Sequence, residues 1–128
     1  MSIKRINIED LPRLKAFCHA TITGDYIHVS GTLGTEVNEM KIVEGGTAAE
    51  TTRIIENFEK ILAGCGATIF DLVKVNVYIT KMEKFGEMNQ AYIAKFGEKA
   101  PARITVGCRE LALGATVEMD GVAYKKAE

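Results

Sequence analysis

The chain has 128 residues, a length typical of one domain with its own core, so we treat residues 1–128 as a single domain. Its 16 basic and 17 acidic residues nearly cancel, which argues against nucleic acid or an anionic membrane as the main partner. No apolar run is long enough to span a bilayer, and the first residues do not resemble a secretory signal. The three cysteines are scattered and odd in number, so we expect a cytoplasmic protein without disulfides.

The first predicted element is a β-hairpin. Residues 15–22 and 26–30 are rich in apolar and β-branched side chains, and Gly24 and Asp25 between them supply the positive φ that tight turns require. The following stretch, residues 31–46, contains several glycines and has no sustained period. It therefore predicts a loop.

A helix is expected to begin at Thr47. Thr47 and Glu50 have the spacing of a capping box, in which each side chain satisfies a free backbone amide. Apolar residues then recur at helical spacing as far as Leu62. Gly64 and Gly66 are typical of a helix end, where the chain often takes a left-handed conformation.

The second half of the chain predicts a strand at 72–79, a helix at 85–96, and two final strands at 103–111 and 116–124. In the first of these strands, alternation predicts that four side chains share one face: Val73, Val75, Val77 and Ile79. The complete order is then β-β-α-β-α-β-β.

This order predicts an α+β fold with one mixed sheet and two helices on one of its faces. The last predicted strand nevertheless has apolar residues on both sides, with Val117 and Met119 opposing Val122 and Tyr124. A sheet whose second face is also apolar usually buries that face against another chain. We therefore expect a homo-oligomer.

The sequence contains no grouping of residues typical of a metal or phosphate site. His19 and His28 have no third ligand nearby, and GTLGTE (31–36) lacks the lysine of a phosphate-binding loop. The cysteines have no neighbouring base and are interpreted as small core residues. We expect no metal and no cofactor.

The remaining candidates for chemistry are Arg103 and the acids of the last predicted strand. A guanidinium keeps its charge, so placing Arg103 beside an apolar strand requires an anion to meet it. Glu118 and Asp120 lie two residues apart and so point to the same side of their strand. If the last two strands pair as an antiparallel hairpin, either acid can lie near Arg103. The pair is then a structural salt bridge, or a carboxylate-binding pocket in which the acid activates water.

The order of the motifs resembles the RidA/YjgF family, also called the endoribonuclease L-PSP family. PARITVGCRELALGATVEMDGVAY (101–124) is similar to the C-terminal signature of that family. VSGTLG (29–34), the helix–strand centre at 46–85 and MNQAYIAKF (88–96) are similar to its upstream motifs. The resemblance covers about residues 15–124.

The resemblance implies a chorismate-mutase-like fold, assembled as a homotrimer with a barrel-like core and with sites between neighbouring subunits. It also implies an activity. Family members with the arginine hydrolyse reactive 2-imino or enamine acids, such as 2-aminoacrylate and 2-iminopropanoate, to 2-keto acids and ammonia without a cofactor. The expected partner is a small imino or keto acid, and neither nucleic acid nor a membrane.

The resemblance also assigns roles to residues of this chain. Arg103 binds the substrate carboxylate, and Glu118 positions and deprotonates the attacking water. Five further residues match the family's substrate pocket: Phe17, Ser30, Gly31, Asn89 and Thr105. Phe17 stands where the family has a tyrosine, so a hydroxyl is lost, and Gly107 and Cys108 also replace commoner residues.

Two alternatives to an enzyme remain at this point. The first is a non-catalytic protein of the same family that binds small carboxylates or keto acids. The second follows from relatives called translation inhibitors or ribonucleases. The basic residues of this chain are interleaved with acids, which makes the second alternative the weaker one.

Overall fold

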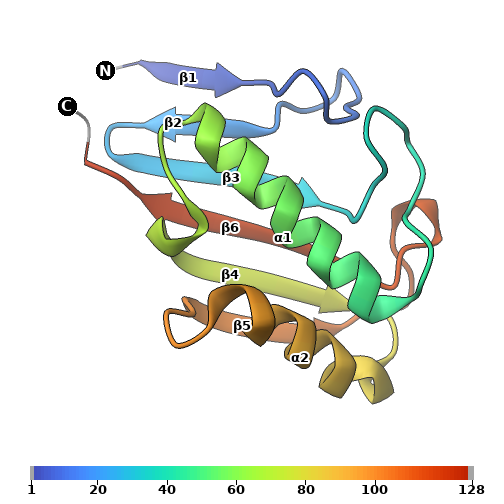
Figure 1. Cartoon of the computed structure of the whole chain (residues 1–128). Coiled ribbons are helices and arrows are strands. Elements are labelled where there is room, and N and C mark those ends of the chain that lie inside the picture. Colours follow the sequence, from blue (N-terminus) through green and yellow to red (C-terminus); the bar gives the residue numbers. More distant parts are fainter. Residues whose placement is uncertain (1, 127–128) are drawn as a thin grey trace.

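The computed structural model describes residues 2–126, which form one six-stranded mixed sheet with two helices on one face (Figure 1). The strands are β1 (Ile3–Ile6), β2 (Ala20–Thr23), β3 (Tyr26–Thr32), β4 (Leu72–Ile79), β5 (Ala102–Gly107) and β6 (Val117–Tyr124). The helices are α1 (Thr47–Gly64) and α2 (Phe85–Phe96), and short 3-10 turns lie at Ile69–Asp71, Met82–Lys84 and Ala112–Gly114. The predicted α+β fold, with one sheet and one helical layer, is confirmed.

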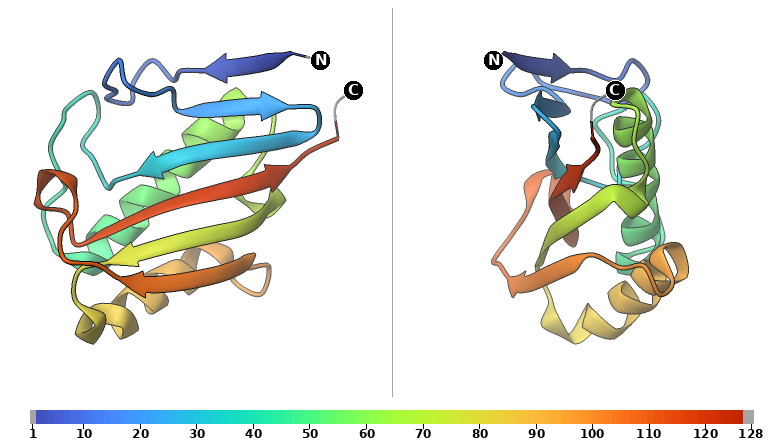
Figure 2. Two further views of the ribbon diagram at one scale, coloured as in Figure 1. Left: turned by 180° about the vertical axis from the view of Figure 1, so that it is seen from behind. Right: turned by 90° about the vertical axis from the view of Figure 1, so that its left-hand side faces the viewer.

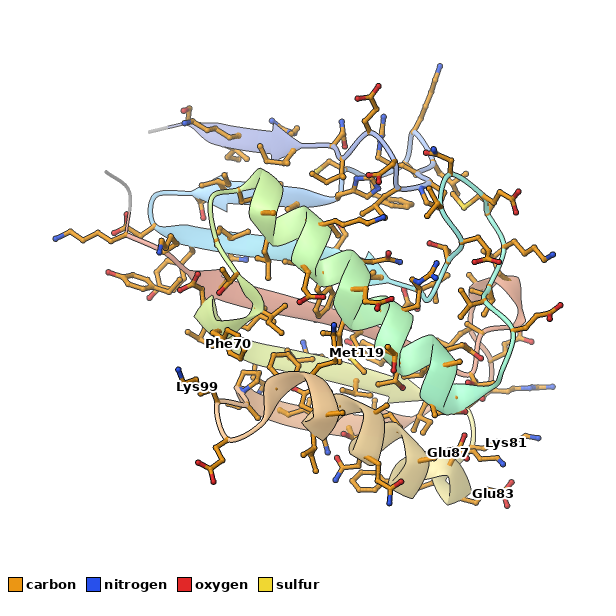
Figure 3. The ribbon with its side chains drawn as sticks, in the orientation of Figure 1. Phe70, Lys81, Glu83, Glu87, Lys99 and Met119 are labelled. Carbon is orange, nitrogen blue, oxygen red and sulfur yellow. The ribbon has the colours of Figure 1, made fainter. Side chains whose placement is uncertain are left out.

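The strand order is β1-β2-β3-β6-β4-β5, and β4–β5 is the parallel pair. Both helices lie on the same side of the sheet, and the core fills the space between the sheet and the helices (Figure 2). Phe58 of α1, Val77 of β4 and Met119 of β6 are completely buried there; Met119 is labelled in Figure 3. The helical spacing seen in the sequence therefore marks the faces that pack on the sheet.

The N-terminal hairpin differs from its prediction in its bounds. The turn at Gly24 is confirmed, with φ of +59°. The strand expected at 15–22 begins only at Ala20, however, and the strand expected at 26–30 continues to Thr32. Strand β1 was not predicted, because most of its residues are exposed and it has no apolar alternation.

The predicted capping box at the start of α1 is wrong. The residue that caps the helix is Gly46, and no side chain bonds to the free amides. Glu50 instead accepts two hydrogen bonds from Thr116, one from the backbone N–H (2.8 Å) and one from the hydroxyl (2.9 Å). The Thr47 and Thr116 hydroxyls also share a hydrogen bond of 2.8 Å. The polar side chains of the first turn therefore bind the start of β6.

Three of the four β4 residues that were predicted to share a face do so. Val75, Val77 and Ile79 are completely buried, whereas Val73 is 47% exposed. The register against β6 shifts between Leu72 and Lys74, which is the mark of a β-bulge. The extra residue breaks the alternation, so Leu72 takes the buried place expected for Val73.

The antiparallel hairpin considered for the last two strands is not formed. Strand β5 pairs with β4 in parallel, and β6 lies between β3 and β4, antiparallel to both. The helix α2 joins β4 to β5 as a crossover connection, and such a connection places two strands side by side in parallel. Strand β5 therefore lies at the edge of the sheet, and β4 separates it from β6.

The face of the sheet opposite the helices carries exposed apolar side chains, as the pattern of the last strand predicted. Ile104 of β5 is 51% exposed, and Val106 lies beside it on the same face. Tyr26 and Tyr124 pack edge to face, with ring centroids 5.3 Å apart.

No helix within residues 2–126 is long and apolar enough to cross a membrane.

Candidate active site

Glu118 extends from β6 on the face of the sheet that the helices leave open. It aligns with Tyr78 of β4 and lies directly against Gly31 of β3. A Cβ atom added at Gly31 would be 2.6 Å from Glu118 Oε2, so a residue larger than glycine would displace this carboxylate. The carboxyl group of Glu118 has no hydrogen-bond or ion-pair partner in the part of the chain that the structure describes.

The environment of Glu118 favours its protonated form. Partial burial raises the pKa of the Glu118 carboxyl above its ordinary value, and the negative charge of Asp120 raises it further. Both acids lie on the open face, as the spacing of two residues predicted. A carboxyl with a raised pKa and no partner is a candidate general base.

Asp120 is in a different situation, because its oxygens are already in use. It accepts hydrogen bonds from Asn76 Nδ2 (2.7 Å) and from the Tyr78 hydroxyl (3.1 Å). The hydrogen bond to Asp120 raises the pKa of Tyr78. Asp120 is therefore a structural acid, and Glu118 is the acid available for chemistry.

Ser30 and Phe17 lie on the same side of the molecule as Gly31. The Ser30 hydroxyl donates to the Cys18 carbonyl oxygen (2.6 Å), and the Ser30 N–H donates to that of His19 (3.0 Å). These bonds hold the segment after Phe17 against the irregular end of β3. Phe17 and Gly31 line one small cavity of about 60 Å³, together with Leu11, Pro12, Thr32, Leu33, Thr35, Met40 and Asn57.

Arg103 lies on the other face of the sheet, beneath α2. It aligns with Val75, whose side chain is completely buried under the helices. Its guanidinium carbon lies 4.8 Å from the ring centroid of Tyr92 and 5.6 Å from that of Phe85. Among residues 2–126 it has no hydrogen-bond or ion-pair partner, so the structural salt bridge left open by the sequence is not formed within the chain.

Thr105 lies on the same strand face as Arg103, and Asn89 belongs to the helix whose rings contact Arg103. Thr105 aligns with Val77 and shares the helix-facing side of β5, where its hydroxyl is buried without a partner in the described chain. Asn89 lies four residues after Phe85 and three before Tyr92 on α2, so it shares their stretch of the helix. Phe85 and Tyr92 were missed as site residues. Their spacing of seven residues was visible, but their contact with Arg103 depends on the parallel pairing of β5.

The predicted site residues thus form two groups. We call Phe17, Ser30, Gly31 and Glu118 the glutamate group, and Asn89, Arg103 and Thr105 the arginine group. Arg103 and Glu118 lie on β5 and β6, which flank β4. Their pairing partners on β4, Val75 and Tyr78, are three residues apart, which corresponds to roughly 14 Å between the Cα atoms of Arg103 and Glu118. Their side chains also point to opposite faces. One small molecule therefore cannot contact both within one chain.

The described residues contain no group of three or more histidine, cysteine or acidic side chains placed to hold a metal ion. His19 has both ring nitrogens engaged. Nδ1 accepts a hydrogen bond from the Ile8 N–H (2.8 Å), which leaves Nε2 to donate to the Pro12 carbonyl oxygen (3.2 Å). Its role is to hold the segment before β2.

The structure thus combines an α+β fold, an open sheet face, and an arginine and a glutamate whose side chains have no hydrogen-bond or ion-pair partner among residues 2–126. Comparison with known proteins gives the family to which such a chain belongs. The family model described as Endoribonuclease L-PSP matches residues 8–125. The chain belongs to this family, the RidA/YjgF family.

Individual relatives agree with this assignment. A RutC family protein of Pyrococcus abyssi is 36% identical over 110 residues, which cover 86% of this chain and 87% of that protein. The 2-iminobutanoate/2-iminopropanoate deaminase of Rattus norvegicus is 29% identical over 110 residues, covering 86% and 80%. The crystal structure of RidA from the Antarctic bacterium Psychrobacter sp. is 29% identical with a TM-score of 0.86, covering 94% of this chain and 99% of that one.

Proposed function

We propose that this protein hydrolyses reactive 2-imino and enamine acids of the 2-aminoacrylate/2-iminopropanoate class to 2-keto acids and ammonia. The observation that carries the proposal is that the side chains of Arg103 and Glu118 both lack a hydrogen-bond or ion-pair partner among the described residues of their own chain. A permanent cation and a carboxyl with a raised pKa are left available to a ligand. The relative from Rattus norvegicus, named as a deaminase of such imines, supports the same chemistry.

In this proposal Arg103 binds the substrate carboxylate. The guanidinium presents its N–H donors in one plane and matches a carboxylate in a bidentate manner, and each charged hydrogen bond contributes about 1.5–3 kcal/mol. Thr105 on the same strand face and Asn89 on the helix whose rings contact Arg103 complete this end of the site. The arginine group therefore orients the imine and does not take part in proton transfer.

Glu118 provides the proton transfers. It accepts a proton from water while the water oxygen attacks the imine carbon, and it passes that proton to the imine nitrogen, which gives the neutral carbinolamine. It then takes the hydroxyl proton of the carbinolamine and passes it to nitrogen as the C–N bond breaks, which releases ammonia and the 2-keto acid and regenerates the carboxylate. Its raised pKa brings the base closer to neutral pH, where general-base catalysis contributes about 10²–10⁴ in rate.

The separation of the two groups supports a site shared between copies of the chain. Arg103 lies on the edge strand β5, and Glu118 lies on the open face with its exposed apolar residues. A head-to-tail contact that brings β5 of one copy against the open face of the next joins the two groups and closes into a ring. We propose a homotrimer with a barrel-like core and inter-subunit sites.

The cavity beside Gly31 supports a preference for short side chains. Its volume of about 60 Å³ is far below the ~150 Å³ of a protein cavity that admits benzene. Phe17, Pro12 and Met40 make most of its wall apolar. The preferred substrates are therefore expected to be 2-imino acids with methyl or ethyl side chains and not those with aromatic side chains.

The test is the release of ammonia and keto acid from imines generated in situ by an amino-acid oxidase or a threonine dehydratase. Wild type is expected to accelerate the release, and Arg103→Ala is expected to abolish the acceleration. No acceleration with small, branched or aromatic imines would refute the enzyme.

A non-catalytic carboxylate binder is the second candidate, and Phe17 favours it because the ring there lacks the family's hydroxyl. Glu118→Gln separates the two candidates. A non-catalytic binder shows no turnover in wild type and keeps its affinity for 2-keto acids in this variant. The enzyme shows turnover in wild type and loses it in this variant.

A further inference from the structure

The guanidinium of Arg103 contacts two aromatic rings of one helix. The centroids of Tyr92 and Phe85 are 4.8 Å and 5.6 Å from its central carbon, and both rings meet it with their faces. The two residues are seven apart on α2, which is about two turns or 10.5 Å along the helix axis. Residues seven apart lie on the same side of a helix, so one guanidinium can contact both rings. We call Phe85 and Tyr92 the aromatic pair.

This arrangement leaves the hydrogen-bond donors of Arg103 available. The two cation–π contacts engage the faces of the rings and occupy none of the guanidinium N–H groups in a hydrogen bond to a described residue. Glu87, an acid on the first turns of the same helix, pairs with Lys84 at 4.0 Å instead (Figure 3 labels Glu87). The arginine is thus held by contacts that do not compete with a carboxylate ligand.

The ring of Tyr92, and not its hydroxyl, makes the contact. The hydroxyl is buried without a hydrogen-bond partner in residues 2–126. Burial raises the pKa of Tyr92 to about 12, although the positive charge of Arg103 acts in the opposite direction. The phenol therefore stays neutral, and no phenolate pairs with the guanidinium.

The two rings differ in how firmly they are held. Tyr92 is 2% exposed and packs on Phe96, with ring centroids 4.6 Å apart. Phe85 is 37% exposed and lies at the first turn of α2. The Tyr92 ring is a fixed inner wall, and Phe85 covers the guanidinium from the outer side.

We infer that Phe85 and Tyr92 are positioning residues, which orient Arg103 so that its in-plane donors meet the carboxylate of an imino or keto acid. The inference rests on the proposed function, because it assigns the aromatic pair to the arginine that binds this carboxylate. Orienting the long side chain before the ligand arrives lowers the entropy cost of binding. Loss of the pair therefore weakens recognition of the carboxylate and leaves other contacts of the ligand in place.

The experiment measures, by calorimetry, the affinities of 2-oxobutanoate and of its neutral primary amide. The ratio of the two affinities reports the contribution of the carboxylate. Tyr92→Leu is expected to lower the ratio roughly tenfold, in line with the strength of a desolvated cation–π contact, and Phe85→Leu roughly two- to fivefold, because its ring is partly exposed. Tyr92→Phe keeps the ring and is expected to keep the ratio.

Phe96→Leu is the matched control, because it removes a ring packed on Tyr92 in the same core without touching Arg103. It is expected to lower the melting temperature and leave the ratio unchanged. If Tyr92→Leu does not fold, the more exposed Phe85→Leu carries the test.

Arg103→Ala, measured in parallel, separates failure of the inference from failure of the proposed function. If Arg103→Ala loses the preference for 2-oxobutanoate over its amide while the folded leucine variants keep it, the inference about the aromatic pair is overturned but the proposed function is not. A ratio lost equally in Tyr92→Phe and Tyr92→Leu also overturns it, because the hydroxyl then contacts the ligand. If Arg103→Ala keeps the preference for the acid, or if wild type shows no such preference, both the inference and the proposed role of Arg103 are overturned.

Discussion

Arg103 and Glu118 lie on opposite faces of the sheet, and β4 runs between the strands that carry them. The two main candidates for catalysis and substrate binding are therefore separated within each chain, and neither side chain has a hydrogen-bond or ion-pair partner among the described residues. A site that uses both must be assembled from two copies. This relationship is the basis of the first prediction.

Mixing two inactive variants is expected to restore activity. Arg103→Ala and Glu118→Gln each lose turnover alone, but an interface between them can combine the intact arginine of one chain with the intact glutamate of the other. With equal amounts of both chains randomly assorted in a closed ring, about a quarter of the interfaces carry both intact residues. Co-refolding the two variants and measuring imine hydrolysis checks this.

The control for the mixing experiment is Arg103→Ala refolded with the double variant, in which no interface contains an intact arginine. Mixed oligomers that form, as judged by native mass spectrometry, but stay inactive would show that the site is not shared between copies.

Glu118→Gln is expected to lower turnover about 10²–10⁴-fold and to raise stability at neutral pH. The folded chain raises the pKa of this carboxyl, so the folded state binds the proton more tightly than the unfolded state. Stability of the wild type therefore falls as pH rises through and above the ordinary glutamate range, and it is recovered in acid. Glutamine has no charge to bury.

Melting temperatures of wild type and Glu118→Gln between pH 4 and pH 8 check the stability prediction. The difference in favour of glutamine is expected to grow with pH. A wild type that is the more stable at neutral pH would mean that Glu118 is a paired structural acid.

Asp120→Asn is expected to move the acid limb of the activity profile to lower pH. The charge of Asp120 is the second cause of the raised pKa of Glu118, so removing it brings that pKa closer to normal while burial keeps it raised. The measurement is kcat/KM as a function of pH, which reports the pKa of the base in the free enzyme.

Asn76→Ala is the matched control for Asp120→Asn. It removes the 2.7 Å hydrogen bond to Asp120 but keeps the negative charge. The acid limb is not expected to move to lower pH in this variant. An unchanged limb in Asp120→Asn would show that the two carboxylates do not interact.

Local patterns in the sequence predicted the elements better than their pairing. The helical spacing of α1 and α2 and the turn at Gly24 depend on neighbouring residues, and all three are confirmed. The capping box at Thr47 and Glu50 failed because Thr116, distant in sequence, competes for the same side chains. A local motif predicts a local bond only when no tertiary partner offers a better one.

The arrangement of the site could not be predicted because it depends on strand order. Placing Arg103 beside Glu118 assumed that consecutive strands pair, whereas the crossover through α2 brings β5 to β4. The choice of Arg103 and Glu118 came from charge and from the family resemblance, and their roles remain predictions. The aromatic contact of Arg103 needed both the spacing of α2 and the position of β5.

Gly31→Ala and Gly34→Ala are expected to fail in different ways. A Cβ at Gly31 meets the end of the flexible Glu118 side chain at 2.6 Å, so the carboxylate moves and the backbone does not. A Cβ at Gly34 meets the backbone oxygen of Glu50 at 2.7 Å, in the first turn of α1, which cannot move alone. We expect Gly31→Ala to lower turnover at nearly unchanged stability, and Gly34→Ala to cost about 1–3 kcal/mol of stability by overpacking.

Gly86→Ala is the control for both glycine variants, because a Cβ at this position on α2 has no atom within 4 Å. Alanine also favours the helix, so this variant should be neutral or slightly stabilising. Thermal unfolding and imine hydrolysis of the three variants check the prediction together. If Gly31→Ala is as destabilised as Gly34→Ala, the close approach of Glu118 to Gly31 supports the fold and does not serve to position the base.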